Sequence, residues 1–373
     1  MKKILCILAL MISLVCMLAA CKNDQSPTIS ISEDGYWVID GEKTDVKAKG
    51  EKGESAISEN PQGLAFYLKD DGNYAVEIGC ARYLSKIEIP ATYNGKPVTE
   101  IGRFGDDSGN TVLKEITIPD SVTTIGARAF NNCDALTSIT LPDSVTTIGE
   151  MAFANCDNLT SITIGNSVTG IGVRAFYSCT SLANVTISDS VSTIGAWAFY
   201  RCTSLVNVTI PDSVTTIGEY AFYDCSNLTS ITIPNSVPTI GDFSFYGCSK
   251  LASVTIGNSV TTIGMKAFYN CDSLTSVTIP DSVTTIGSSA FYSCDNLTSA
   301  TIGTSVTTIH YDAFYYCENL TSVTFANPNG WWYANKADAT SGTPITASDL
   351  SDVSTAAQYL KSSYRIYYWF RTA

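Results

Sequence analysis

The sequence predicts a repeat solenoid, a stack of short units that each contact only their neighbours. Two observations carry this prediction. Leucine, isoleucine and phenylalanine return every 23 residues over residues 113–325, almost without gaps. In addition, no single unit can bury its own apolar side chains, so neighbouring units must stack to form one continuous core. The composition agrees with a folded chain, because 45% of the 373 residues are hydrophobic and 15% are charged.

The first 20 residues, 1–20, are predicted to be a secretory signal peptide. Lys2 and Lys3 precede an apolar run over residues 4–15, which is too short to span a membrane. The stretch LAAC that ends at Cys21 resembles the bacterial lipobox. This resemblance implies that Cys21 carries lipid and becomes the first residue of the mature chain. Residues 21–34 are polar and are predicted to form a lipid-anchored tether.

Two small segments are predicted between the tether and the regular repeats. Residues 35–62 are expected to form a small hairpin and a linker, because alternating aromatic and β-branched residues are followed by glycines. Residues 63–112 are expected to hold an N-terminal cap and a first, irregular repeat. No Ala-Phe pair follows Gly102 there, and residues 105–111 are predicted to be an irregular loop.

The unit over residues 136–158, LTSITLPDSVTTIGEMAFANCDN, indicates how each rung of the stack folds. Residues 138–141 alternate polar and apolar side chains, which predicts a short strand with one buried face. Residues 142–144 are Pro, Asp and Ser, which favour a turn. Phe153 is expected on a short helical turn. Each rung is therefore predicted to hold one short parallel strand, a turn and a short helical segment.

The repeat pattern LxxIxIPxxVxxIGxxAFxxCxx resembles the BspA-like leucine-rich repeats of bacterial surface proteins. The resemblance covers residues 113–325, and residues 84–98 are similar to the expanded first repeat of that family. It implies a repeat solenoid of leucine-rich-repeat type. It further implies a surface-anchored protein that presents this solenoid for adhesion.

Residues 326–373 are predicted to form a C-terminal aromatic cap, because an exposed end of the core would aggregate. Two aromatic-rich stretches, 331–333 and 364–370, flank a predicted helix over residues 354–361 with Ser354 as its N-cap. The same aromatic density is compatible with a ligand-binding module. Both interpretations stay open at the level of the sequence.

Nine of the 13 cysteines follow the repeat: Cys133, Cys156, Cys179, Cys202, Cys225, Cys248, Cys271, Cys294 and Cys317. Identical side chains in stacked rungs point in parallel, so their Cβ atoms stay about 4.8 Å apart, beyond the usual ~3.5–4.5 Å of a disulfide. We therefore predict buried, reduced thiols that react only after unfolding. The cysteines lack the CxxC spacing that is typical of a metal site. Cys80 lies just before the first predicted strand and is expected to begin this ladder of cysteines.

Two sets of aromatic residues form the candidate binding surface. Trp197, Tyr220 and Phe243 occupy one variable position in three adjacent units and are predicted to form an exposed aromatic patch. Tyrosine also follows the core phenylalanine in seven consecutive units: Tyr177, Tyr200, Tyr223, Tyr246, Tyr269, Tyr292 and Tyr315. Either these tyrosines contact a protein or a glycan, or they stack on one another and shield the edge of the core.

Threonine recurs on the outward face of the predicted strands, from Thr117 to Thr324. Regular hydroxyl arrays of this kind occur in ice-binding solenoids. The alternative is that threonine is present for its high strand propensity and solvates this face.

The sequence does not indicate an enzyme. Its single histidine, His310, excludes mechanisms that need two, and no nucleophile-elbow, zinc-protease or phosphate-loop motif is present. A net charge of −13 argues against binding to a nucleic-acid backbone. We expect no cofactor and no metal.

The function predicted from these features is that of a lipid-anchored protein of the bacterial cell envelope, exposed at the outer membrane or cell surface, whose solenoid mediates adhesion or protein–protein binding. The expected partners are a host matrix protein or another cell-surface protein, or a glycan, together with the membrane through Cys21. The solenoid itself is expected to be a monomer. The first alternative is a structural envelope lipoprotein without a dedicated ligand, and the second is a glycan-binding module.

Overall fold

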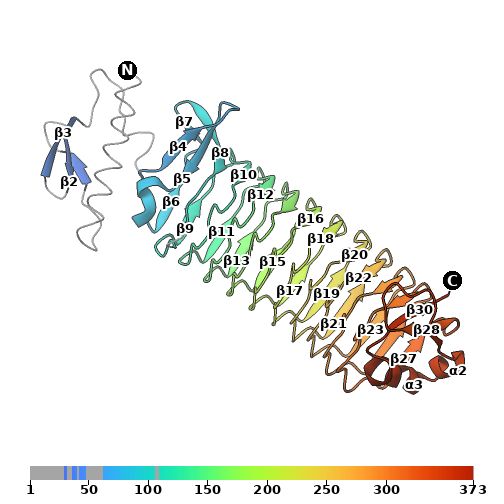
Figure 1. Ribbon diagram of the computed structural model, residues 1–373. Coiled ribbons are helices and arrows are strands. Elements are labelled where there is room, and N and C mark those ends of the chain that lie inside the picture. Colours follow the sequence, from blue (N-terminus) through green and yellow to red (C-terminus); the bar gives the residue numbers. More distant parts are fainter. Residues whose placement is uncertain (1–28, 32–35, 40–41, 48–61, 106–108, 373) are drawn as a thin grey trace.

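The main body of the chain is a β-solenoid of about 11 turns that runs between two caps (Figure 1). The computed structural model describes residues 29–31, 36–39, 42–47, 62–105 and 109–372. The predicted signal peptide, Cys21 and most of the tether and the linker lie outside these residues. The prediction of a repeat solenoid is confirmed. No helix in the described part of the chain is long and apolar enough to cross a membrane.

A small antiparallel sheet precedes the solenoid in the sequence. Its strands β1 (Ile29–Ile31), β2 (Tyr36–Ile39) and β3 (Glu42–Lys47) pair in the order β1-β2-β3. The expected hairpin corresponds to β2 and β3. Strand β1 lies within the segment predicted to be a tether, so that prediction is wrong for residues 29–31. The Ile-Ser-Ile alternation of β1 is the period-two pattern of a strand.

The N-terminal cap is built from a hairpin and the first irregular rung. Its elements are β4 (Ala65–Leu68), β5 (Tyr74–Glu77), the 3-10 helix η1 (Gly79–Tyr83), β6 (Lys86–Glu88), β7 (Thr92–Tyr93) and β8 (Lys96–Ile101). Strands β4 and β5 are antiparallel, whereas β5 pairs in parallel with β8, which continues into the first regular rung. The cap therefore converts a hairpin into the parallel ladder of the solenoid.

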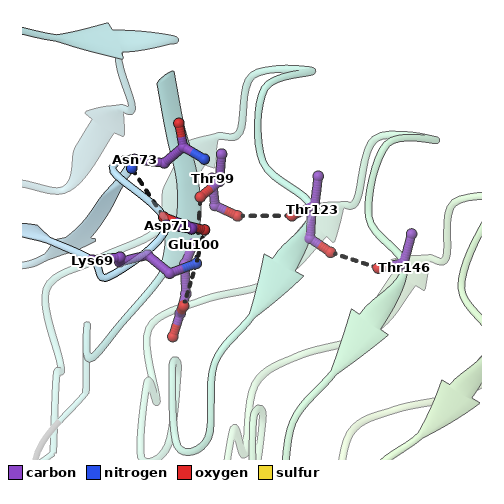
Figure 2. A network of polar contacts seen from close by, with 7 residues as sticks. All are labelled: Lys69, Asp71, Asn73, Thr99, Glu100, Thr123 and Thr146. Carbon is purple, nitrogen blue, oxygen red and sulfur yellow. Dashed lines mark hydrogen bonds and ion pairs between the residues drawn. The ribbon is translucent and has the colours of Figure 1, made fainter. Parts of the chain in front are cut away.

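A polar network joins this cap to the ladder (Figure 2). The Lys69 ammonium lies 3.0 Å from the Glu100 carboxylate and 3.4 Å from that of Asp71. One rung further, the Thr123 hydroxyl donates to the Thr99 carbonyl at 3.3 Å, and the hydroxyl of the following rung repeats this bond. The lysine thus ties the cap hairpin to β8, where the inter-rung hydroxyl bonds begin.

Each regular rung contains two strands rather than the single strand predicted. The first strand has three or four residues and buries alternate side chains. In rung order these strands are β9 (Glu115–Thr117), β11 (Ser138–Thr140), β13 (Ser161–Thr163), β15 (Asn184–Thr186), β17 (Asn207–Thr209), β19 (Ser230–Ile233), β21 (Ser253–Ile256), β23 (Ser276–Ile279), β25 (Ser299–Ile302) and β27 (Ser322–Phe325). They pair in parallel and in register within the groups β6-β9, β11-β13-β15-β17, β19-β21 and β23-β25-β27, so that Thr140 lies opposite Thr163 on the exposed face.

The second strand of each rung is a Thr-Ile or Gly-Ile pair that follows the turn. These strands are β10 (Thr124–Ile125), β12 (Thr147–Ile148), β14 (Gly170–Ile171), β16 (Thr193–Ile194), β18 (Thr216–Ile217), β20 (Thr239–Ile240), β22 (Thr262–Ile263), β24 (Thr285–Ile286) and β26 (Thr308–Ile309). Two residues are too few for alternation to be visible in the sequence, which is why this strand was not predicted.

The expected short helical segment is absent from the regular rungs, and consecutive turns take its place. Each turn holds two residues with positive φ, as at Trp197 (55°) and Arg201 (58°), which breaks any helical run. In eight successive rungs the N–H groups at three alternate turn positions donate to the next rung, as in Trp197 to Glu219, Phe199 to Ala221 and Arg201 to Tyr223 (3.0, 2.8 and 2.7 Å). The turns therefore form a third hydrogen-bonded face.

The core is a set of identical side chains stacked along the solenoid. Phenylalanine rings from Phe130 to Phe314 are fully buried, with neighbouring centroids 5.1–5.3 Å apart. Phe104 precedes them at 5.6 Å from Phe130, although no Ala-Phe pair marks it in the sequence. The nine ladder cysteines are also fully buried, and all ten cysteines of the described residues are free thiols.

Cys80 does not begin the ladder of cysteines. The equivalent of the ladder position, three residues before the first leucine of a unit, is Ala81, which is 1% exposed, whereas Cys80 is only half-buried. In the first regular rung the position belongs to Asn110. Its side-chain amide donates to the Phe104 carbonyl at 3.0 Å and accepts from the Leu113 amide at 3.0 Å. An asparagine thus closes the first turn in place of a thiol.

The C-terminal cap covers the last rung with aromatic residues. It comprises β28 (Trp331–Ala334), β29 (Thr343–Pro344), α2 (Ala347–Ser351), α3 (Val353–Gln358), the π-helix η2 (Tyr359–Ser363) and β30 (Tyr368–Arg371). Strand β30 runs antiparallel between β26 and β28 and thereby closes the ladder. Trp331 and Trp369 are buried, and their rings lie 5.3 and 6.2 Å from that of Phe325.

The helix predicted over residues 354–361 has a different start. Helix α3 begins at Val353, and its N-cap is Asp352, whose carboxylate accepts the Thr355 amide at 2.7 Å. Ser354 is not the cap, and its hydroxyl instead donates to the Asp352 carboxylate. Aspartate is a better N-cap here because its charge also complements the helix dipole.

Candidate functional site: two aromatic columns

The predicted tyrosine ladder is a continuous column of stacked rings. From Tyr177 to Tyr292, successive ring centroids are 4.5–4.8 Å apart and the ring planes are within 11° of parallel. All of these rings are half-buried. The tyrosines therefore cover one another's faces, as one interpretation of the sequence proposed, while their outer edges remain accessible to a partner.

The residues of the predicted aromatic patch form a second column beside the first, and they are half-buried rather than exposed because their rings cover one another. The Trp197 and Tyr220 rings are 5.2 Å apart and the Tyr220 and Phe243 rings 4.6 Å apart, both nearly parallel. A cation closes each end of this column. The Arg174 guanidinium lies 4.8 Å from the Trp197 centroid, and the Lys266 ammonium lies 5.4 Å from that of Phe243. Cation–π attraction of this kind holds the outermost rings in place.

The two columns lie side by side and line an open hollow on the surface. The ring of Tyr220 is 5.8 Å from that of Tyr223, and the ring of Phe243 is 6.0 Å from that of Tyr246, with planes inclined by 35° and 36°. The hollow has a volume of about 520 Å³, and we call it the aromatic hollow. It is lined by Met151, Arg174, Tyr177, Trp197, Tyr200, Tyr220, Tyr223 and Phe243. The remaining ladder residues, Tyr246, Tyr269, Tyr292 and Tyr315, do not line it.

The residues of the second column occupy a backbone conformation that does not suit them. Arg174, Trp197, Tyr220, Phe243 and Lys266 all have φ between 53° and 57°. The left-handed region costs a residue with a Cβ about 1–2 kcal/mol, and glycine, asparagine and aspartate tolerate it best. For bulky side chains this conformation is a genuine outlier, which points to a role beyond folding.

The same rungs supply an internal comparison for this strain. The residue before each ladder cysteine also has positive φ, and five of these nine are Asn, Asp or Gly: Asn132, Asn155, Asp224, Gly247 and Asn270. Among the nine residues of the second column's position only Asp312 is of this type. The position before the cysteine holds the residue types that tolerate positive φ, whereas the position of the second column does not. The backbone conformation therefore does not account for the aromatic residues at the position of the second column.

The chemistry of the hollow is that of ring edges and phenol hydroxyls. Burial is the main cause that raises the pKa of Tyr200 and of Tyr223, so both hydroxyls stay protonated hydrogen-bond donors at neutral pH. Most ring faces are covered by the next ring or by a terminal cation. The described residues hold no group of three or more His, Cys, Asp or Glu side chains that could bind a metal.

Three other candidate residues lie away from the hollow or outside the described chain. Tyr315 leaves the stack, since its ring is turned by 82° to that of Tyr292 and packs under the Arg365 guanidinium at 3.6 Å. His310 contacts the ring of Tyr368 in the C-terminal cap, and burial lowers its pKa. Cys21 lies outside the described residues.

Sequence reasoning did not find the two terminal cations of the second column. Arg174 and Lys266 occupy the same repeat position as the three aromatic residues, one rung before and one rung after them. This shared position was the signal available, because stacking brings equivalent positions together. The contact between the two columns could not be predicted from repeat positions, because it depends on the direction in which the side chains point from the turn.

The stacked phenols should make the stability of the folded protein fall at alkaline pH. Burial, followed by the neighbouring phenols of Tyr292 and Tyr246, raises the pKa of Tyr269 from 10.0 to about 12. Because the folded-state pKa lies above the unfolded one, the stabilisation from this group is complete below pH 10 and is lost as pH rises toward 12. We expect urea midpoints to fall over this window. Tyr269→Phe should flatten the fall, and an equally steep fall in that variant would contradict the assignment.

The 23-residue rungs define the class of this protein as a leucine-rich-repeat solenoid, which is typically a non-enzymatic binding scaffold. The chain belongs to the family described as the BspA type leucine rich repeat region, whose model matches residues 108–229 and 215–330 with six copies. It is a leucine-rich repeat protein of the bacterial surface-protein type.

Several solved bacterial structures resemble the chain. The T. pallidum leucine-rich repeat protein is 28% identical, with 58% of this chain and 91% of that chain covered and a TM-score of 0.45. A leucine-rich repeat protein from Bacteroides ovatus is 25% identical over 70% of this chain and 93% of that one, with a TM-score of 0.38. A leucine-rich cell surface protein from Faecalibacterium prausnitzii is 25% identical over 74% and 96%, with a TM-score of 0.34. No curated protein matches the chain.

Proposed function

We propose that this protein is a surface-exposed adhesin, anchored by lipid on Cys21, that binds a partner protein through the aromatic hollow. The observation that carries the proposal is the run of Trp197, Tyr220 and Phe243 at strained left-handed positions. Large, rigid rings at the centre of an interface supply most of its binding energy. The lipobox-like sequence at Cys21 and the family of bacterial surface proteins support the location.

The geometry favours a protein partner over a glycan or a purely structural role. Sugars pack their C–H faces on exposed ring faces, but most faces in the two columns are covered by a neighbouring ring. A structural lipoprotein without a ligand would gain no net stability from aromatic residues at these positions, because the stacking they provide is offset by left-handed strain that asparagine or glycine would relieve. A protein partner can use the ring edges and the hydroxyls together.

The test replaces the three central rings with a residue that the backbone prefers. We expect Trp197→Asn, Tyr220→Asn and Phe243→Asn together to abolish adhesion of cells that display the full chain, to matrix proteins or to other cells. The stability of the purified protein should change by no more than about 1 kcal/mol, because relief of left-handed strain offsets lost stacking. Antibody binding to intact cells verifies equal display on the surface.

The matched control changes the same backbone conformation elsewhere. Arg128→Asn, Ser293→Asn and Tyr316→Asn alter three other residues with positive φ that do not line the hollow. Cells that display this control should adhere as the parent does. Full adhesion of cells with the first variant would overturn the proposal, and so would equal losses in both variants.

A further inference from the structure

We propose that the segment bound in the aromatic hollow is a proline-rich stretch of the partner in the polyproline II conformation, lying along the solenoid axis. This inference rests on the proposed binding function of the hollow and names the class of its ligand. It follows from three features of the hollow: its repeat distance, its supply of hydrogen-bond donors and its length.

The repeat distance of the columns matches that of a polyproline II helix. Neighbouring tyrosine rings are 4.5–4.8 Å apart, so equivalent groups two rungs apart recur at twice this distance. A polyproline II helix repeats after three residues of about 3.1 Å each, or about 9.3 Å per turn. Every second rung therefore meets the same face of the ligand. An α-helix, with a pitch of about 5.4 Å, or a strand, with same-face residues about 6.6–6.8 Å apart, falls out of step within two rungs.

The polar chemistry of the hollow is complementary to that of the ligand backbone. Polyproline II has no internal hydrogen bonds, and a proline-rich chain offers carbonyl acceptors with few N–H donors. Tyr177 and Tyr223, which lie two rungs apart, present hydroxyl donors on the wall of the hollow, and Tyr200 lies on the rung between them. Proline rings are apolar and rigid, and they pack against aromatic edges at a low cost in conformational entropy.

The length of the hollow sets the size of the ligand. Its lining residues belong to five rungs, from that of Met151 to that of Phe243. Four steps of about 4.8 Å span about 19 Å, which corresponds to about six residues, or two turns, of polyproline II. The lining ends at Met151 on one side and at Phe243 on the other, where the Lys266 ammonium lies over the Phe243 ring. We therefore expect peptides longer than this to gain little further affinity.

The experiment measures binding of a fluorescently labelled decaproline peptide to the full chain by fluorescence anisotropy. We expect saturable binding that is at least tenfold tighter than that of a glycine-serine peptide of equal length. A peptide of alternating valine and threonine, which favours a strand, should bind no better than the glycine-serine peptide. Equal affinity for all three peptides, or no binding of decaproline, would overturn the inference.

Conservative variants test the hydroxyl donors without disturbing the stack. Tyr177→Phe and Tyr223→Phe together should weaken decaproline binding about fivefold or more, since each removes one hydrogen bond but keeps its ring. Tyr269→Phe is the matched control from the same column, outside the hollow, and should bind decaproline as the parent does. Unchanged affinity in the double variant would show that the donors have no part in recognition.

The failures of the two proposals are distinguishable. If the triple asparagine variant loses adhesion while decaproline neither binds the parent nor competes with adhesion, the binding function stands and the polyproline inference is wrong. If adhesion survives in the triple variant, the proposed function itself is wrong. Loss of adhesion together with competition by decaproline, but not by the glycine-serine peptide, supports both.

Discussion

Nine thiols of this protein should remain unmodified by a small alkylating reagent in the native state and react completely once the chain is unfolded. All nine ladder cysteines are 0% exposed. Eight of them, from Cys156 to Cys317, donate an S–H bond to the carbonyl of a core phenylalanine at 2.9–3.3 Å. Burial raises the pKa of Cys202 to about 12, so little reactive thiolate exists. We expect native and unfolded labelling rates to differ more than about a thousandfold.

Cys80 supplies the internal control for this measurement. It is half-buried on η1 and lies outside the core, so it should react with the reagent in the native protein. Mass spectrometry of the labelled chain separates the two classes of thiol. Native-state modification of several ladder cysteines would contradict the packing described above, as would disulfides between neighbouring rungs.

Removal of one core ring should destabilise the protein strongly, whereas removal of a surface ring should not. Phe222 is fully buried between Phe199 and Phe245, at 5.2 and 5.3 Å. We expect Phe222→Ala to lower the free energy of unfolding by about 3–5 kcal/mol, because it leaves a cavity that stacked neighbours cannot fill. Urea denaturation monitored by circular dichroism measures the change.

Phe243 is the matched surface residue for this comparison. It lies one rung further on, is half-buried and contacts the Tyr220 ring and the Lys266 ammonium. Phe243→Ala makes the same chemical change but should cost only about 1 kcal/mol, the value of a surface ring contact. Equal losses from both substitutions would mean that the second column is part of the core rather than a binding surface.

The parts of the fold predicted from the sequence are those that depend on repetition alone. Equivalent residues 23 positions apart must be neighbours once units stack, so the columns of Phe, Cys and Tyr follow directly. The two-residue strands such as β12 were not predicted, because two residues are too few to show the alternation that marks a strand. The caps do not repeat, and Asn110 and Asp352 act there through side-chain bonds that the repeat pattern cannot specify.

The candidate site was predicted only in part for a related reason. The sequence placed Trp197, Tyr220 and Phe243 in one patch, and the structure brings them together. It did not indicate that these residues have positive φ, because aromatic residues are poor markers of left-handed turns. The sequence also did not indicate how the rings of the two columns are inclined to each other. The hollow lined by Tyr220 and Tyr223 could therefore not be predicted from it.

The hydrogen bonds of the turn face all run one way, which gives the solenoid a polarity. Each amide of this face donates toward the C-terminal end of the stack, so the two ends of the turn face present different groups. At the first end the Phe104 and Asn110 amides donate to carbonyls of the opening turn; at the last, the Arg365 carbonyl accepts the Asp312 amide. The caps are therefore not interchangeable. Whole 23-residue rungs can be gained or lost between them without altering either junction, so the length of the array can change while its direction is conserved.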